Sequence, residues 1–330
     1  MIDHWTTPHW ATPIPEVSYY IGMNLIWDPA SSKVWDAFHR EHGGALQQSW
    51  GYGAALGRLG VRVHRAIAEL DGRTVAIAQF ICRRVPAYLT LSSCTRGPVW
   101  APDLEPQARR TLYRRLRSEL PAPRLRVTLF SPDRTAAELA PAEVAGLRRV
   151  MTGYSTVILD LRQTPEVLRA AFDGKWRNRL VKAETEKKLQ VHVNSNVPKC
   201  RELLDREGKQ RESRNFHGLP TDFVVHWIDA AASPAAAFVI ARADFDGDTV
   251  AAMLFLLHGS VATYHIGWAN DAGRDLNAHN LLLWRATNLL RERGIASIDL
   301  GGVNTHSLPG ISRFKLGTGG AVRTLAGTYC

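Results

Sequence analysis

A ten-residue stretch that occurs twice decides the fold: Asp71-Gly-Arg-Thr-Val-Ala-Ile-Ala-Gln-Phe80 recurs as Asp246-Gly-Asp-Thr-Val-Ala-Ala-Met-Leu-Phe255. Asp-Gly is typical of a hairpin turn, because both central positions of a type I′ turn need a positive φ angle. The apolar run after each turn has the composition of a buried strand. We therefore predict a hairpin at each copy, and the spacing of about 175 residues indicates an internal duplication.

The same order of elements is predicted beyond both turns. A further strand, a helix and a last strand are expected at residues 88–93, 106–119 and 125–130 in the first copy and at 261–268, 277–293 and 297–300 in the second. This order is typical of a mixed sheet flanked by helices, in the α/β or α+β class. It is also the core order of the GNAT acyltransferase fold. Two tandem GNAT-like domains are predicted, with a cleft between them as a common place for a ligand.

The length of 330 residues agrees with two domains, which we place at 1–150 and 151–320. Apolar residues make up 45% and charged residues 22%, so long disordered segments are excluded. Lysine and arginine exceed the acids by 41 to 31, which gives a net charge of +10. Such an excess favours a nucleic acid, a nucleotide-linked substrate or an acidic membrane surface as partner, and a generally basic protein is the alternative.

Several classes of protein do not fit the sequence. Neither a signal peptide nor a membrane-spanning segment is expected, since the apolar run at 250–257 is too short, and a cytoplasmic location is predicted. Contact with a membrane surface from outside the bilayer stays open. The four cysteines form no CxxC and the histidines no HExxH, so no metal site is expected.

The densest chemical signal is Asp299-Leu-Gly-Gly302 followed by Leu308-Pro-Gly-Ile-Ser-Arg-Phe-Lys-Leu-Gly-Thr-Gly-Gly320. Glycine is expected where backbone approaches a ligand or takes a positive φ angle. Within this segment Lys315 is a compact charge that can reach a developing oxyanion or a phosphate. The alternative is a tight turn between two strands with Lys315 in solvent.

Two basic segments could hold phosphates. In the segment 172–188, Lys175, Arg179 and Lys182 share one helical face that could follow a phosphate backbone. The alternative there is a solvated amphipathic helix whose inward side chains are Trp176, Leu180 and Ala183. In the second segment, an arginine pair before a Gly–Pro loop could hold a pyrophosphate, or could simply end a charged helix. That pair is Arg211 and Arg214.

The loop that cradles the pyrophosphate of acetyl-CoA in GNAT enzymes, R/Q-x-x-G-x-G/A, is missing. The corresponding stretches, 102–107 and 268–277, lack the glycines whose backbone amides would face the phosphates. Both helices that follow are therefore predicted to be unsuited to CoA.

These features resemble the Fem family, the FemABX-type aminoacyl-tRNA-dependent peptidyltransferases built from two GNAT-like domains. The resemblance covers most of the chain, and its most specific part is 299–320. The other segments that carry it are Leu46-Gln-Gln-Ser-Trp-Gly51, Thr95-Arg-Gly-Pro-Val-Trp100, Trp176-Arg-Asn-Arg-Leu-Val-Lys-Ala-Glu184 and 264–284.

The resemblance implies transfer of an amino acid from a charged tRNA to an amine of a peptidoglycan precursor, with formation of a peptide bond. The activated ester drives the reaction, so no cofactor, ATP or metal is implied. It also implies that 321–330 returns to complete the first domain. No room for the family's long helical arm exists in the second domain, so the chain resembles the armless members.

The resemblance also assigns roles to residues. Phe314 and Lys315 would lie at the tRNA terminus, with Lys315 stabilising charge in the transition state. The acceptor and its phosphates would be held by Arg211 or Arg214 with Phe216 nearby, by Tyr264 and by Asp133. The tRNA itself would contact the basic helix through Lys175, Trp176, Arg177, Arg179 and Lys182.

The sequence departs from the family pattern in one informative place. Members often have a lysine soon after the Gln…Trp segment, which binds the acceptor diphosphate. Here Trp50 is followed by Gly-Tyr-Gly-Ala-Ala-Leu-Gly-Arg58, so either Arg58 substitutes or the acceptor differs.

Two other functions stay open. One is a GNAT-type N-acyltransferase that takes its acyl group from a thioester and modifies another small-molecule amine. The other is an RNA-binding module without activity, which would bind tRNA whether or not it is charged.

Overall fold

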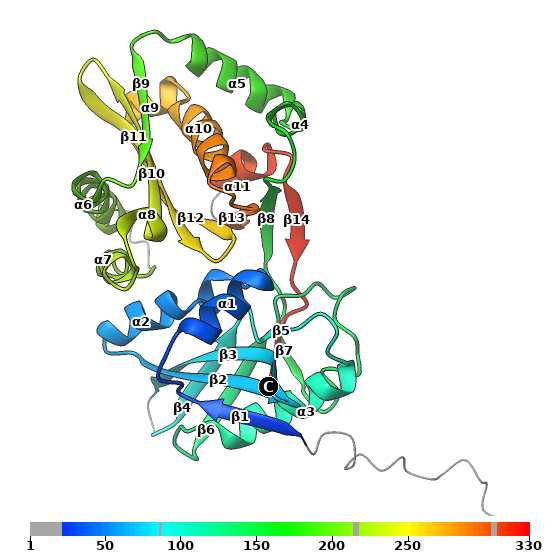
Figure 1. Cartoon of the computed structure of the whole chain (residues 1–330). Coiled ribbons are helices and arrows are strands. Elements are labelled where there is room, and N and C mark those ends of the chain that lie inside the picture. The colour runs from blue at the N-terminus through cyan, green and yellow to red at the C-terminus, as the bar shows by residue number, and fades with distance from the viewer. Residues whose placement is uncertain (1–21, 86–87, 214–217, 305–308) are drawn as a thin grey trace, which may run out of the picture.

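The computed structural model describes residues 22–85, 88–213, 218–304 and 309–330, which form two sheets with flanking helices (Figure 1). The predicted mixed α/β fold with two GNAT-like domains is confirmed. The first domain contains β1 (Met23–Trp27), α1 (Lys33–Glu41), a 3-10 turn (Leu46–Gln48), α2 (Trp50–Arg58), β2 (Arg62–Leu70), β3 (Arg73–Arg84), β4 (Thr90–Thr95), β5 (Val99–Trp100), α3 (Pro106–Glu119), β6 (Arg126–Ser131) and β7 (Arg149–Met151).

The second domain is built on the same plan with additional helices. Its elements are β8 (Ser155–Asp160), α4 (Pro165–Ala170), α5 (Gly174–Thr185), β9 (Leu189–Asn194), α6 (Val197–Ser213), α7 (Asp222–Asp229), α8 (Pro234–Ala237), β10 (Phe238–Phe245), β11 (Asp248–His258), β12 (Val261–Ala269), α9 (Asp271–Asp275), α10 (Ala278–Glu292), β13 (Ser297–Gly302), α11 (Pro309–Leu316) and β14 (Ala321–Thr324). A last strand, β15 (Thr328–Tyr329), follows.

The topology of the two sheets bears out the duplication. The first sheet has the order β1-β2-β3-β4-β6-β15-β7, with β5 against β3, and the second has the order β14-β8-β13-β12-β11-β10-β9. In both, a hairpin and a second antiparallel strand are followed by a crossover helix, α3 or α10, into a parallel strand. The two predicted turns have the expected backbone, with positive φ angles at Asp71, Gly72, Asp246 and Gly247.

The closing segment serves both domains rather than the first alone. Strand β14 pairs with β8 in the second sheet, and only β15 joins the first sheet, between β6 and β7. The chain therefore crosses between the domains twice, at 152–154 and at 325–327. The two crossings lie side by side, since the Leu325 amide donates to the Tyr154 carbonyl at 3.0 Å.

The glycine-rich segment near the C-terminus differs from the turn considered for it. Residues Pro309–Leu316 form α11. Proline fits its first position because the N–H group that proline lacks has no partner within the helix there. Consequently, Lys315 is carried by a helix, and its side chain is buried instead of lying in solvent.

Apolar side chains fill the interface between the domains. Each sheet has its own core, and a third cluster joins them: Leu56 of α2 and Ile81 of β3 belong to the same buried cluster as Phe223 and Trp227 of α7. The rings of Tyr52 and Phe223 meet edge to face at 5.3 Å between centroids. Among the described residues, no helix has the length and apolar character needed to cross a membrane.

We expect Leu56→Ala to lower the free energy of unfolding by about 2–5 kcal/mol, because it leaves a cavity in the cluster that joins the domains. Leu56 is only 2% exposed. The measurement is urea denaturation followed by circular dichroism. Val322→Ala, at a side chain 53% exposed, is the control and should change the value by less than about 0.5 kcal/mol. Equal losses in the two variants would show that the interface contributes little.

Candidate functional site

The site begins where two parallel strands of the second sheet separate. Strands β12 and β13 are paired only from Val261 to Thr263 and from Ser297 to Asp299. The next residues of both strands, 264–267 and 300–302, line a cavity of about 500 Å³. Helices α6 and α11 supply the rest of its wall. Separation of parallel strands at their carboxyl ends creates a crevice of the kind in which α/β proteins bind ligands.

A bulge in β12 brings consecutive side chains to the cavity. Leu254 of β11 pairs with Ile266, whereas the next residue, Phe255, pairs with Tyr264, so His265 is an extra residue. A bulge re-aims the side chains around it, which explains how Tyr264, His265 and Ile266 all line the cavity. Gly267 is part of the same arrangement, because a Cβ atom there would lie 1.9 Å from the Tyr264 hydroxyl oxygen.

Lys315 reaches the cavity from α11. Its residue surface is 8% exposed, and its Nζ donates to the Gly302 carbonyl at 2.8 Å. Its Nζ also lies 5.9 Å from the centre of the Tyr264 ring, within the range of a cation–π interaction. Burial lowers the pKa of Lys315, and attraction to the Asp299 carboxylate opposes that shift. An ammonium held in this way can donate hydrogen bonds to an anionic group that enters the cavity.

The remaining polar groups of the cavity are held in defined states. Arg211 of α6 forms an ion pair with Glu207, at 2.8 Å, and donates to the Leu219 carbonyl. Burial, aided by Arg211, lowers the pKa of His265 to about 4, so this imidazole is neutral at pH 7. Burial raises the pKa of Tyr264, which therefore keeps its proton.

Three residues predicted from the sequence thus line one cavity: Lys315, Tyr264 and Arg211. Phe314 does not line it: its side chain packs against the core of the second domain, with its ring 5.9 Å from that of Trp176. Asp133 also lies elsewhere, in the first domain, where it binds Arg96. Arg214 and Phe216 fall outside the described residues.

The basic helix predicted to bind tRNA is α5, and it lies beside α11. Lys175, Arg177, Arg179 and Lys182 are exposed, as expected for a contact surface. Trp176 is not part of that surface: it is 2% exposed, and its indole N–H donates to the Phe314 carbonyl at 3.1 Å. The burial of the aromatic residue ties α5 to α11.

A groove between α5 and α11 lies near the cavity. Its volume is about 650 Å³, and its lining includes three cations, Lys175, Arg179 and Arg313. Ser312 of α11 lines both the groove and the cavity, so both hollows border the same helix. The structure thereby brings the basic face of α5 next to the helix that carries Lys315.

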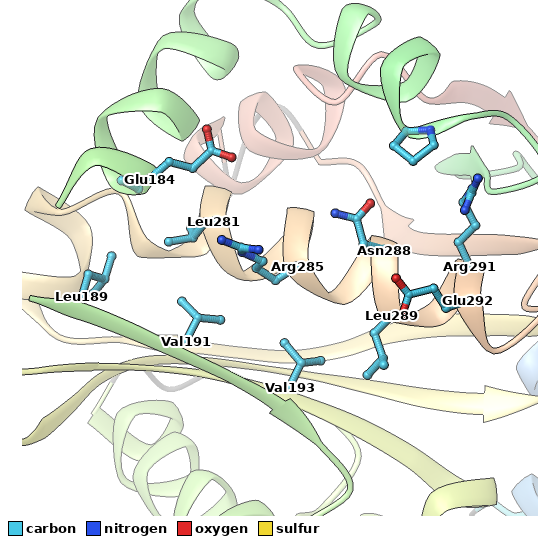
Figure 2. Close-up of a pocket in the computed structure, with 12 residues that line it drawn as sticks. Glu184, Leu189, Val191, Val193, Leu281, Arg285, Asn288, Leu289, Arg291 and Glu292 are labelled. Carbon is cyan, nitrogen blue, oxygen red and sulfur yellow. The ribbon is translucent and has the colours of Figure 1, made fainter. Parts of the chain in front are cut away.

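Two other hollows lie away from Lys315, and one of them contains the predicted residue Asp133. A groove of about 710 Å³ runs between β9 and α10, with valine and leucine on its floor and Glu184, Arg285 and Glu292 among its charged lining residues (Figure 2). A pocket of about 240 Å³ lies at the junction of the domains and includes Asp133, Arg96 and Arg323.

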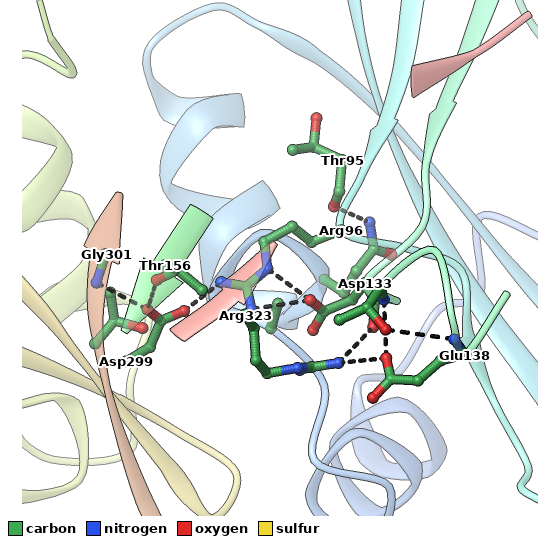
Figure 3. Close-up of polar contacts among 12 residues, drawn as sticks. Thr95, Arg96, Asp133, Glu138, Thr156, Asp299, Gly301 and Arg323 are labelled. Carbon is green, nitrogen blue, oxygen red and sulfur yellow. Dashed lines mark hydrogen bonds and ion pairs between the residues drawn. The ribbon is translucent and has the colours of Figure 1, made fainter. Parts of the chain in front are cut away.

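Sequence reasoning missed the residues that support the site across the domain junction. Arg96 binds both Asp133 and Asp299, and Asp299 also accepts from the Thr156 hydroxyl at 2.6 Å (Figure 3). Arg96 and Asp299 both lie in segments that resemble the Fem family, but nothing in the sequence shows that the two side chains are in contact. Glu207 was also missed, although its position four residues before Arg211 on a helix is a usable signal.

A short helix stands where GNAT enzymes have the loop that binds the pyrophosphate of CoA. Between β12 and α10 lies the short helix α9, which begins with Asp271. Its Gly273 packs against the sheet, since a Cβ atom there would lie 2.2 Å from the Val250 carbonyl oxygen. An acidic residue and a packed glycine do not form a cradle for a pyrophosphate. Among the described residues, no group of three or more His, Cys, Asp or Glu side chains is placed to hold a metal ion.

Comparison with known proteins agrees with this geometry. Residues 170–316 match the family model described as an acetyltransferase (GNAT) domain. The structure is similar to a crystal structure of FemX, with a TM-score of 0.78 and 15% identity over 92% of this chain and 96% of that one. The fold is a Fem-type tandem of GNAT domains. No curated protein matches the chain.

Two further structures share the tandem fold. One is the C-terminal domain of a protein provisionally described as a lysylphosphatidylglycerol synthetase, from Agrobacterium fabrum, with a TM-score of 0.55 and 15% identity over 91% of this chain and 92% of that one. The other is a tandem GNAT protein from the clavulanic acid biosynthesis pathway, with a TM-score of 0.52 and 12% identity over 93% and 97%. The predicted resemblance to the Fem family is confirmed for the fold.

We expect Gly267→Ala to lower the free energy of unfolding by about 1–3 kcal/mol, because the new methyl group would displace the Tyr264 ring from its place in the cavity wall. Thermal denaturation measures the change. Gly174→Ala is the matched control, since no atom lies within 4 Å of a Cβ atom built there. That control should be neutral or slightly stabilising, and a similar loss in both variants would contradict the close contact.

Proposed function

We propose that this protein is an aminoacyltransferase that moves an amino acid from aminoacyl-tRNA to an amine of a peptidoglycan precursor or a related amine. The observation that carries the proposal is the position of Lys315, which lines the cavity at the diverging strands from α11, the helix that also lines the basic groove beside α5. The groove suits a phosphate backbone, and the cavity suits the reacting ester. The similarity to FemX in fold supports this reading.

The chemistry needs little from the protein beyond position and charge. The acceptor amine attacks the ester carbonyl, a C–N bond forms, and the carbonyl oxygen becomes an oxyanion. The Lys315 ammonium is the donor placed to stabilise that charge. The C–O bond to the ribose then breaks, and the proton lost by the amine ends on the departing hydroxyl. Holding both substrates in one cavity supplies the rest of the rate enhancement.

Removal of the Lys315 ammonium should reduce transfer about 10²- to 10³-fold in kcat, as expected for the loss of one donor to an oxyanion. The variant is Lys315→Met, which keeps the length of the side chain. Formation of product from charged tRNA and a muropeptide amine is followed by mass spectrometry. Lys33→Met, at an exposed lysine of α1, is the control and should be fully active. Full activity of Lys315→Met would eliminate its role.

The basic face of α5 should account for part of the salt dependence of tRNA binding. Replacing Lys175, Arg179 and Lys182 together by alanine should reduce the slope of log affinity against log salt concentration by about 2–3, since each phosphate contact contributes about 0.7–0.9. Binding is measured by filter retention at several salt concentrations. The control removes three exposed arginines of the first domain, Arg84, Arg117 and Arg124, with the same change in net charge. An equal change in the control would show that only net charge matters.

A second candidate is an N-acyltransferase that uses an acyl thioester, and the match to the acetyltransferase (GNAT) model favours it. The tandem GNAT neighbour from the clavulanic acid pathway has the same architecture. The acidic helix α9 at the position of the CoA loop argues against free CoA as the donor. Treatment with RNase distinguishes the two, because it should abolish transfer from aminoacyl-tRNA and leave transfer from a thioester unchanged. Binding of tRNA without any product would instead indicate an RNA-binding module.

A further inference from the structure

One buried ion cluster connects the first domain to the cavity of the second. The Arg96 guanidinium lies between two carboxylates, that of Asp133 on its own domain, at 2.9 Å, and that of Asp299 on β13 (Figure 3). The side chains of Arg96 and Asp299 are 7% and 6% exposed, so neither charge is screened by much water. Attraction to Asp133 and Asp299 outweighs burial and raises the pKa of Arg96, which stays charged.

The first domain holds Arg96 in place from several sides. Arg96 has a φ angle of 52°, which is unusual for a residue other than glycine and persists only where the surroundings fix it. Gln48 provides that support, since its side-chain amide donates to the Thr95 carbonyl at 2.9 Å and exchanges hydrogen bonds with the Gln79 backbone. Both segments of the first domain that resemble the Fem family therefore meet at this arginine.

Asp299 connects Arg96 to the cavity through a hydrogen bond to the backbone of β13. Its second oxygen accepts from the Gly301 amide at 2.8 Å, and Gly301 has a φ angle of 76°. The turn presents the next carbonyl, that of Gly302, to the Lys315 ammonium at 2.8 Å. The negative charge of Asp299 also favours the protonated form of Lys315, against its burial. Position and charge of Lys315 thus both depend on Asp299.

We propose that Arg96 is a positioning residue of the site: a first-domain guanidinium that fixes Asp299 and, through it, the backbone carbonyl and the charge that hold Lys315. The relevance of Lys315 to transfer rests on the proposed function, whereas the coupling of Arg96 to Lys315 does not. The other charged or titratable groups that face Lys315 in the cavity are Glu207, Arg211, Tyr264 and His265.

The test is a double-variant cycle with Arg96→Met and Asp299→Asn. Because Arg96 acts through Asp299, Arg96→Met should reduce kcat at least tenfold in the otherwise unchanged protein and less than about twofold when Asp299→Asn is already present. Arg96→Lys keeps one positive charge but loses the planar guanidinium that binds both carboxylates. Its kcat should therefore lie between that of the unaltered protein and that of Arg96→Met. Asp299→Asn is nearly isosteric, and if Arg96→Met folds poorly the same cycle is run with Arg96→Lys in its place.

The pH dependence of Lys315 protonation shows whether the buried cluster sets the charge of Lys315 or only stabilises the fold. Asp299→Asn removes a negative charge near Lys315, so the ammonium should lose its proton at a lower pH than in the unaltered protein. The alkaline limb of kcat/KM should therefore move to lower pH. A second measurement of the protonation of Lys315 needs no enzyme activity. The rate at which an amine-reactive reagent labels Lys315 is followed against pH, with exposed Lys33 as the internal reference. Arg73→Met is the matched control, because its partner is the exposed Asp103.

The outcomes are distinct. A shifted labelling curve in Asp299→Asn and a non-additive cycle support the inference. An unshifted labelling curve, an equal effect of Arg96→Met in both backgrounds, or the same effect from Arg73→Met would overturn it. Absence of transfer from every charged tRNA by the unaltered protein would refute the proposed function. Labelling of Lys315 in Arg96→Met, with and without Asp299→Asn, would then decide the coupling of Arg96 to Lys315.

Discussion

The parallel pairing of β12 with β13 stops after three residue pairs, and the candidate site depends on that stop. Beyond Thr263 and Asp299 the two strands separate, and the space between them becomes a cavity instead of a continuous sheet. The bulge at His265 lies just beyond the last residue of β12 that pairs with β13 and turns the next side chains of that strand toward the cavity. Helix α11 then places a buried ammonium against the exposed end of β13.

The first domain has a clear physical role even though the cavity belongs to the second. Its apolar contacts with α7 fix the two domains against each other. Its Arg96 supplies the counter-charge without which Asp299 would be a buried, unpaired carboxylate at the edge of the site. A single GNAT-like domain would have to find another partner for that charge, which gives a physical reason for keeping two domains in one chain.

Local chemistry made much of the fold predictable. The Asp-Gly turns need only two positive φ angles, and helix α3 has the predicted bounds because its leucine spacing and its proline at the first position agree. Helix α11 could not be foreseen in the same way, since Gly310 and Gly317 at its ends read as a turn. The bulge at His265 depends on the register between β11 and β12, for which the local sequence gives no signal.

The site was predictable in part. Resemblance to a family grouped Lys315, Tyr264 and Arg211, which the structure places in one cavity. Contacts between distant segments were beyond sequence reasoning: Arg96 and Asp299 are 203 residues apart, and their meeting follows from the docking of two domains. For Trp176 the sequence allows either a place on the tRNA-binding surface or an inward position, and the structure shows the inward one, with the residue 2% exposed.

The double crossing between the domains limits how the molecule can move. Residues 152–154 and 325–327 run side by side and are bonded to each other at Tyr154 and Leu325. A single connecting strand allows one domain to rotate about it, but a pair of bonded strands anchored in both sheets resists torsion. The domains should therefore resist rotation about the crossing, so the cavity and the first-domain residues that support it keep their relative positions.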